Sequence, residues 1–353
     1  MMNAEKWLKH KWYWLILLSC CWFFLGGRTR PVQAADTGSD FTIVPDFGSG
    51  QTDDQLAYYS LKTQPGQQYP LTVTVSNLSP TEELAFTVQL VAATTTDQGE
   101  INYTPATTAP DKSAAVLLPA LADDQATTRT ITLAPASKQQ VTFDLTMPQA
   151  PLKGTVLGSV YVQRKTTSGT SQGQLGIKNQ FAMALPVMLV QAGQTGLAPQ
   201  LALTAIKPKA TGGVATLIAS IHNSAPVLFG QIALDARVYR AGAKQVLFEQ
   251  TDHNYKMAPN STLDYHINTA GKSLAPGHYQ LKIKLTSGAS VFNLERRFTI
   301  KKTTAAATDR QLIQKRTHYP WLLWLLIGFG VITLGALVFI WHKMREIKSR
   351  LKH

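Results

Sequence analysis

Of the eight histidines of the chain, the five between residues 222 and 318 are the side chains best suited to acid–base or metal chemistry, and their spacing argues against both. They lie far apart, form no His-x-x-x-His pair that a helix would bring together, and have no cysteine near them. A zinc site needs such ligands at close spacing. We therefore expect no metal and no other cofactor. We interpret the five as surface or turn residues: His222, His253, His266, His278 and His318.

The segment 169–173, Gly-Thr-Ser-Gln-Gly, formally matches the Gly-x-Ser-x-Gly pattern around a nucleophilic serine. That pattern works where a buried strand runs directly into a helix, whereas this segment lies in a polar stretch between two predicted strands. Asp46, Asp53 and Asp54 form an acidic group, but it lacks the ligand spacing and the glycine of a known calcium loop. We therefore expect no catalytic residue, and the chain is not predicted to be an enzyme.

Four tyrosines in the first half of the chain are better candidates for binding than any residue is for catalysis. Sugars stack on aromatic ring faces, and partner strands add to sheet edges. One hypothesis is that these tyrosines line a groove for a glycan or a protein partner. The alternative, that two or more of them fill the core, stays open. The four are Tyr58, Tyr59, Tyr69 and Tyr103.

The elements that position these residues are predicted to be strands. Residues 71–75 and 279–285 alternate apolar and polar side chains with a period of two, and similar runs recur between them. Residues 181–190 are almost continuously apolar, which predicts a strand covered on both faces. Turns rich in Gly, Pro, Asn and Ser separate the runs. The expected fold class is an all-β ectodomain of two antiparallel, immunoglobulin-like β-sandwiches.

A glycine-rich break around 191–199 predicts the joint between two domains. We expect the first sandwich over 35–192, the second over 193–302, and a polar stalk over 303–319. The stalk is predicted to be partly helical from Asp309 onward. Cys20 and Cys21 both precede the first domain, so neither sandwich is expected to contain a disulfide.

Two apolar segments bracket the strand-rich region. The first, within residues 1–34, follows a basic start and precedes small residues, which is typical of a signal peptide. The second, over 320–341, is long enough to cross a bilayer as a single transmembrane helix. Aromatic side chains near its ends favour the membrane interface, and these are Trp321, Trp324 and Trp341. A cytoplasmic tail over 342–353 carries Lys343, Arg345, Lys348, Arg350 and Lys352. The expected location is the cell membrane, with the strand-rich region outside the cell.

The net charge of +13 is concentrated towards the two ends of the chain. Between them, residues 35–193 hold 8 basic and 13 acidic side chains, whereas residues 194–300 hold 11 basic and 5 acidic ones. A nucleic-acid-binding protein gathers Lys and Arg on one binding element, and no such element is present, so we expect no nucleic acid partner. The basic second half could face anionic wall polymers or lipid headgroups, or it could be an ordinary basic surface.

Several motifs resemble those of the WxL-interacting proteins of Firmicutes. In the first half they are Phe41–Pro45, Tyr58–Leu61, Pro65–Gln67, Leu71–Asn77, Gly99–Tyr103, Gly154 and Leu157–Val160. In the second half they are Met257–Ser261, Leu274–Leu281 and Phe298–Ile300. No single motif is highly specific, but their order along nearly the whole chain makes a chance match improbable.

The resemblance implies a peptidoglycan-binding domain followed by a host-binding domain, both of sandwich fold and neither enzymatic. It further implies a cell-surface scaffold or adhesin that engages peptidoglycan and a WxL-domain surface protein, a component of the host extracellular matrix, or both. The alternative is an envelope chaperone or assembly scaffold that holds exported subunits by strand addition.

Overall fold

The structure is a computed structural model that describes residues 39–310, apart from 124–125, 166–179, 192, 194–195, 271 and 273, together with residues 312 and 320–350. Several sequence features lie outside the described residues. They are the predicted signal peptide over 1–34 with Cys20 and Cys21, the serine motif at 169–173, His318 and Lys352.

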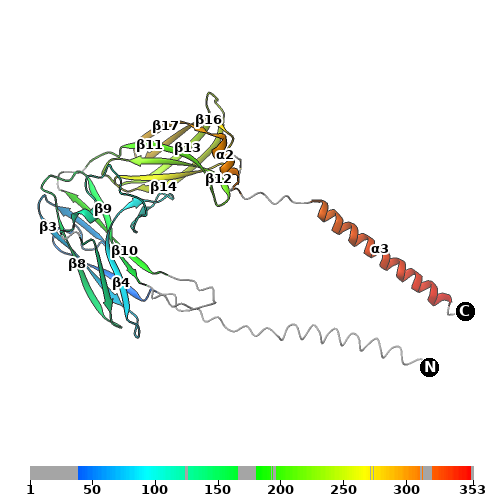
Figure 1. Cartoon of the computed structure of the whole chain (residues 1–353), viewed down its shortest axis with the longest axis horizontal. Helices are drawn as coiled ribbons and strands as arrows, with labels where there is room; N and C mark the ends of the chain where they lie inside the picture. The colour runs from blue at the N-terminus through cyan, green and yellow to red at the C-terminus, as the bar shows by residue number, and fades with distance from the viewer. Residues whose placement is uncertain are drawn as a thin grey trace.

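The first half of the chain forms two sheets whose inward side chains share one core, and we call this half domain one (Figure 1). The smaller sheet has the order β1 (Phe41–Asp46), β3 (Gln68–Asn77), β8 (Lys138–Thr146). The larger sheet has the order β2 (Tyr59–Thr63), β10 (Ala182–Gln191), β9 (Thr155–Arg164), β4 (Leu84–Ala92), β7 (Thr128–Leu133). A short 3-10 helix, η1 (Leu118–Leu121), buries both of its leucines in the same core.

The period-two pattern explains this arrangement. In β3 the alternate residues Leu71, Val73 and Val75 are completely buried, while the threonines between them face away from the core. Each inward side chain of this size contributes about 1.5–3 kcal/mol through burial of its apolar surface. Phe41 and Phe86 come from opposite sheets and pack with their ring centroids 5.0 Å apart, which ties the two sheets together.

Strand β10 differs from expectation in two ways. It pairs with β2 in parallel, although the sheets were predicted to be antiparallel. Its faces are also unequal: Leu185, Val187 and Leu189 are buried, but the residues between them are only half-buried or exposed. The prediction of a strand covered on both faces was therefore wrong. One outward apolar residue, Met188, instead packs against a small cluster where the two halves of the chain meet.

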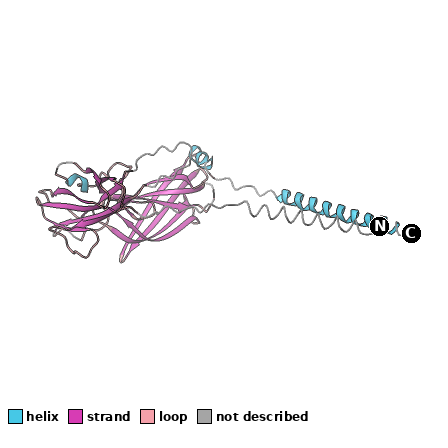
Figure 2. Cartoon of the chain, turned by 90° about the horizontal axis from the view of Figure 1, so that it is seen from below, coloured by secondary structure: helices cyan, strands magenta, loops and turns pink. Residues whose placement is uncertain are grey.

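The second half of the chain, domain two, also has two sheets around a core of its own. One sheet has the order β11 (Leu201–Thr211), β12 (Val214–Asn223), β15 (Ser261–Asn268). The other has the order β14 (Val246–Met257), β13 (Phe229–Arg240), β16 (Gly277–Ser287), β17 (Ser290–Ile300). The described chain is thus dominated by β-structure, as expected, and Figure 2 shows the strands concentrated in the two domains. The immunoglobulin-like class stays a prediction.

A helix lies where the sequence predicted the start of a stalk. Helix α2 (Lys302–Arg310) begins seven residues before Asp309, contacts β11 and buries Ala305 and Thr308. Small and short side chains on one face allow the helix to lie close to the domain. The first part of the predicted stalk is therefore packed against domain two.

The last described element is the helix α3 (Pro320–Arg350) (Figure 1). Large apolar side chains along it are exposed, among them Trp324, Phe329 and Ile332. None of the helices in the described part of the chain meets the combined length and hydropathy of a membrane span. The anchor over 320–341 and the interfacial roles of its tryptophans stay predictions.

Candidate binding surfaces

The four candidate tyrosines divide into two buried and two partly exposed residues. Tyr59 and Tyr69 lie in the core of domain one, with exposed fractions of 1% and 4%. The Tyr59 hydroxyl donates a hydrogen bond to the carbonyl of Thr72 and accepts one from the backbone N–H of Asp46. Burial raises the pKa of Tyr59 to about 12. These two rings hold the sheets of domain one together and present no face to a ligand.

Tyr58 and Tyr103 are not fully buried, and we call this pair the tyrosine surface. Tyr58 packs against the edge of the domain-one core, whereas Tyr103 packs against the small cluster of Ala93, Leu157 and Ala258. Both are half-buried. Burial raises the pKa of the Tyr103 phenol, and the Tyr58 phenol adds to the shift. The Ser159 hydroxyl, which points outward from β9, donates a hydrogen bond of 2.7 Å to the Tyr103 carbonyl and fixes that residue over the sheet.

The acid–base candidates do not assemble into a reactive centre. Within the described residues, no group of three or more His, Cys, Asp or Glu side chains could hold a metal ion. Asp46 accepts a hydrogen bond from Gln140, and Asp53 accepts one from the backbone of Gln55 in a local turn. His222 and His266 each face one aspartate, and both aspartates belong to domain one.

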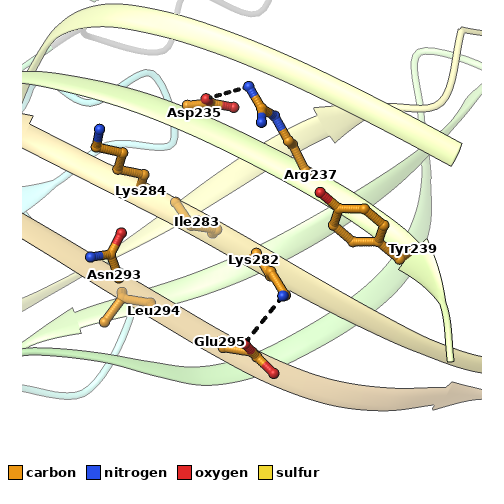
Figure 3. A pocket seen from close by; sticks show the side chains of 9 residues that line it. All are labelled: Asp235, Arg237, Tyr239, Lys282, Ile283, Lys284, Asn293, Leu294 and Glu295. Atoms are coloured by element: carbon orange, nitrogen blue, oxygen red, sulfur yellow. Dashed lines mark hydrogen bonds and ion pairs between the residues drawn. The ribbon is translucent and has the colours of Figure 1, made fainter. Parts of the chain in front are cut away.

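Domain two carries a shallow depression on the outer face of β13, β16 and β17, and we call it the Tyr239 basin (Figure 3). Its volume is about 280 Å³. Two cross-strand rows cross its floor: Asp235, Lys284 and Asn293 form one, and Arg237, Lys282 and Glu295 form the other. The ring of Tyr239 closes one end.

The charges of the Tyr239 basin are only partly satisfied within the domain. Arg237 forms an ion pair of 2.9 Å with Asp235. The Lys282 ammonium lies 3.7 Å from Glu295 and 5.8 Å from the centre of the Tyr239 ring. Lys284 and Asn293 make no side-chain hydrogen bond or ion pair with any described residue. The basin therefore offers a cation, an amide and an aromatic ring to a polar ligand.

Only part of the Tyr239 basin was predictable from the sequence. The alternation over 279–285 predicted one wet face on that strand, which β16 confirms, since Lys282 and Lys284 are exposed. The contributions of β13 and β17 were missed. The alternation Asp235, Arg237, Tyr239 was a usable signal, but the pairing that brings the three strands together could not be derived from local pattern.

Comparison with protein families decides the identity at the family level. The model of the WxL Interacting Protein peptidoglycan binding domain matches residues 41–164, and that of the WxL Interacting Protein host binding domain matches residues 172–310. The chain belongs to the WxL Interacting Protein family. The expected order of the two binding domains is confirmed, and both are described as binding domains rather than enzymes.

The family boundaries can be compared with the sheets. The peptidoglycan binding match covers β1 to β9, and the host binding match ends at Arg310 with helix α2. The second match begins before β10, although β10 pairs with β9 and β2 and completes the larger sheet of domain one. Strand β10 is therefore shared: it belongs to the second family match by sequence and to domain one by pairing.

Among the similar solved structures are three from fimbrial systems. One concerns a chaperone–tip adhesin complex in CFA/I fimbriae biogenesis (9% identity, 72% of this chain and 98% of that chain, TM-score 0.28). Another is the class 5 fimbriae chaperone CfaA (11% identity, 73% and 98%, TM-score 0.26). A third is the Salmonella enterica SafA pilin in complex with the SafB chaperone (12% identity, 67% and 98%, TM-score 0.22). TM-scores this low do not establish any property of this chain. No curated protein matches it.

Proposed function

We propose that this WxL Interacting Protein is a non-enzymatic cell-surface scaffold or adhesin. Domain one engages peptidoglycan, and domain two engages a WxL-domain surface protein, a component of the host matrix, or both. The observation that carries the proposal is the occurrence of both binding-domain matches, in order, over most of the chain. The division of the described strands into two domains, each with its own core, is consistent with two separate recognition tasks.

For domain one we propose the tyrosine surface as the contact with the glycan. Tyr58 and Tyr103 are both half-buried, so each keeps part of its ring exposed, and aromatic rings of this kind stack on sugar faces. The neighbouring outward residues of β9 and β4 include serine, threonine and glutamine, which donate and accept hydrogen bonds.

For domain two we propose the Tyr239 basin as the contact with the protein partner. Lys284 and Asn293 have free hydrogen-bonding capacity there, and Tyr239 supplies an aromatic anchor beside them. Aromatic and charged side chains of this kind dominate the binding energy of protein interfaces.

The proposal includes a membrane anchor over 320–341 with a signal peptide over 1–34. It is supported by the apolar run from Trp321 to Trp341, by the basic residues that follow it, and by the exposed apolar side chains of α3. Tethering raises the local concentration of both domains at the wall, so that modest affinities are sufficient.

The test is a crossed pair of variants in the purified full chain. Tyr58→Ala with Tyr103→Ala should weaken sedimentation with purified peptidoglycan about ten-fold, and should leave capture of a WxL-domain protein unchanged. Tyr239→Ala with Lys284→Ala should do the reverse. Each pair is the control for the other, since both remove aromatic surface. If neither pair changes either interaction, the assigned surfaces are wrong; if the wild-type chain binds neither ligand, the function itself is wrong.

A further inference from the structure

The two domains meet through an extended junction built largely from the motifs that carry the family resemblance. From domain one come the short strands β5 (Thr94–Thr95) and β6 (Ile101–Asn102), drawn in cyan beside β14 in Figure 1. From domain two comes the segment Met257–Ser261 between β14 and β15. Ala258 in this segment is completely buried against Ala93 and Leu157 of domain one. The junction therefore has a small apolar core of its own.

Two glycines allow the backbones to approach at this junction. Gly99 has a φ of +72°, and a Cβ atom on it would lie 1.9 Å from the ring of Tyr255 in domain two. Gly154 also has a φ of +72°, and a Cβ atom there would lie 2.0 Å from the carbonyl oxygen of Pro226. Contacts this close leave no room for any larger residue. The surfaces of the two domains are thus fitted to each other at two separate points.

Backbone hydrogen bonds cross the junction at the same two points. The N–H of Lys256 donates to the Gly99 carbonyl at 2.6 Å, and the N–H of Thr155 donates to the Pro226 carbonyl at 2.8 Å. Between them, the Thr95 hydroxyl accepts a hydrogen bond of 2.9 Å from the N–H of Ala258. These bonds have fixed geometry, and they define one relative orientation of the domains.

Three ion pairs also cross the junction, and all have the same polarity. Domain one supplies the acids and domain two supplies the bases. The nitrogen–oxygen distances are 2.9 Å for Lys256–Glu100, 3.0 Å for His222–Asp111 and 3.7 Å for His266–Asp97. The excess of acid in the first half of the sequence and of base in the second half therefore meets at this surface.

Two of the three bases are histidines, which carry a charge only when protonated. Histidine side chains generally change charge between about pH 5 and 8. The groups that face His222 are Asp111 and the Ser113 hydroxyl, which lies 3.4 Å away. His266 faces Asp97, and the Tyr255 phenol lies close to both Asp97 and Asp252. Each imidazole thus faces a carboxylate of domain one, so a protonated ring is attracted to its partner at both sites.

We propose that the junction is a charge-complementary clamp that holds the two domains in one orientation and tightens when His222 and His266 are protonated. The clamp goes beyond the proposed function, because it depends on neither ligand. Exposed ion pairs are weak, so each histidine shifts the ratio of closed to open clamp by only about two- to five-fold. The apolar and backbone contacts supply the orientation, and the histidines adjust its strength.

The test is the distribution of distances between spin labels on the two domains of the full chain. Labels are placed at the exposed positions Lys138→Cys and Lys209→Cys, with Cys20→Ser and Cys21→Ser removing the native thiols. Double electron–electron resonance should give a single narrow distance distribution at about pH 7.5 that persists at about pH 5.5. Gly99→Val should broaden it.

The matched control for Gly99→Val is Gly212→Val. Gly212 also has a positive φ, of +58°, but has no atom within 4 Å of its Cβ position, so this variant carries the backbone strain without the clash. It should keep the narrow distribution. In the Gly99→Val background, the fraction of narrow component should rise about two- to five-fold per histidine on acidification to about pH 5.5, and His222→Gln with His266→Gln should abolish that rise.

A broad distribution in the unaltered junction at both pH values would overturn the clamp, as would identical results for Gly99→Val and Gly212→Val. An acid response that survives removal of both histidines would overturn their role. Since no ligand is present, none of these outcomes bears on peptidoglycan or WxL binding, and failure of the clamp can be distinguished from failure of the proposed function.

Discussion

Asp111 shows how one side chain connects folding, domain contact and pH. Burial alone would raise the pKa of its carboxyl group, but hydrogen bonds from the backbone N–H and the hydroxyl of Ser113, together with His222, outweigh burial, so the pKa lies below its usual value. A carboxylate of this kind stabilises the folded chain above its unfolded pKa, and that contribution is lost as the pH falls through the lowered value.

We predict that Asp111→Asn lowers the free energy of unfolding by about 1–2 kcal/mol at neutral pH. The loss should begin to shrink as the pH falls below about 4, the pKa of an unfolded aspartate, and should vanish only below the lowered pKa of the native carboxylate, where the wild-type side chain is also protonated. Urea unfolding curves at about pH 7 and about pH 3 measure this difference. Asp309→Asn, at an exposed position in α2, is the control and should change little at either pH. Equal losses for Asp111→Asn at both pH values would contradict the prediction.

The burial of each candidate tyrosine side chain was only partly predictable from the sequence. Tyr58 and Tyr59 are adjacent, and one is half-buried while the other is buried. Tyr58 precedes β2, and the first three residues of β2 are all buried, so the short run Tyr59-Ser-Leu61 contains no alternation from which the burial of either tyrosine could be predicted. Tyr69 precedes the clear pattern of Leu71–Val75 by one period, and could have been placed in the core from it.

At the scale of elements, α2 is the part that the sequence described least well. The predicted stalk contains threonine and alanine and lacks a large apolar stripe, so nothing in its pattern indicated a docked helix. In the structure, Ala305 is buried while Ala306 and Ala307 are exposed, and one face of the helix covers β11.

We predict that Ala305→Glu lowers the free energy of unfolding of domain two by about 2 kcal/mol, because a carboxylate at this position must either lose its water or displace the helix. Ala306→Glu places the same side chain one residue further on, in solvent, and should stay within about 0.5 kcal/mol of the unaltered chain. Thermal unfolding of the full chain, combined with protease sensitivity of residues 302–310, measures both. Equal destabilisation by the two variants would show that α2 does not dock on β11.

Edge strands bear on the alternative in which the protein holds exported subunits by strand addition. Strand β11 contains Pro208, carries a register shift between Leu203 and Ala205, and has the Leu203 carbonyl occupied by Arg296. These features are those by which natural sheets discourage further pairing. The edge of β2 is likewise occupied, by a bridge between Leu61 and Gln51. Binding through sheet faces is therefore the better interpretation for these parts of the molecule.

Strand detection itself followed the side-chain pattern. The alternating runs at 71–75 and 279–285 both lie within strands. Strand β15 was missed although Leu263, Tyr265 and Ile267 alternate clearly within it, whereas β11 was missed because lysines and a proline interrupt its pattern. A clear alternation therefore indicates a strand even at the edge of a sheet, as in β15, whereas an interrupted pattern such as that of β11 does not.

At the scale of the whole molecule, the arrangement of the domains could not be derived from the sequence. The pair Asp111–His222 joins residues that are 111 positions apart, and no local signal marks them as partners. The charge difference between the two halves was visible in the composition and was interpreted as a surface for anionic polymers or as an ordinary surface. In the structure, part of this charge difference is used within the chain, as ion pairs across the junction. Because the junction joins the two domains, the tyrosine surface and the Tyr239 basin are presented by a single body.

The binding isotherm of the full chain on purified peptidoglycan, followed by addition of a WxL-domain protein, tests most directly whether this single body is a two-ligand scaffold. We predict that binding to peptidoglycan saturates, and that the sedimented chain then retains the WxL-domain protein without releasing the wall. A flat isotherm up to about 1 mM protein, or release of peptidoglycan when the second protein binds, would contradict a scaffold that holds both partners at once.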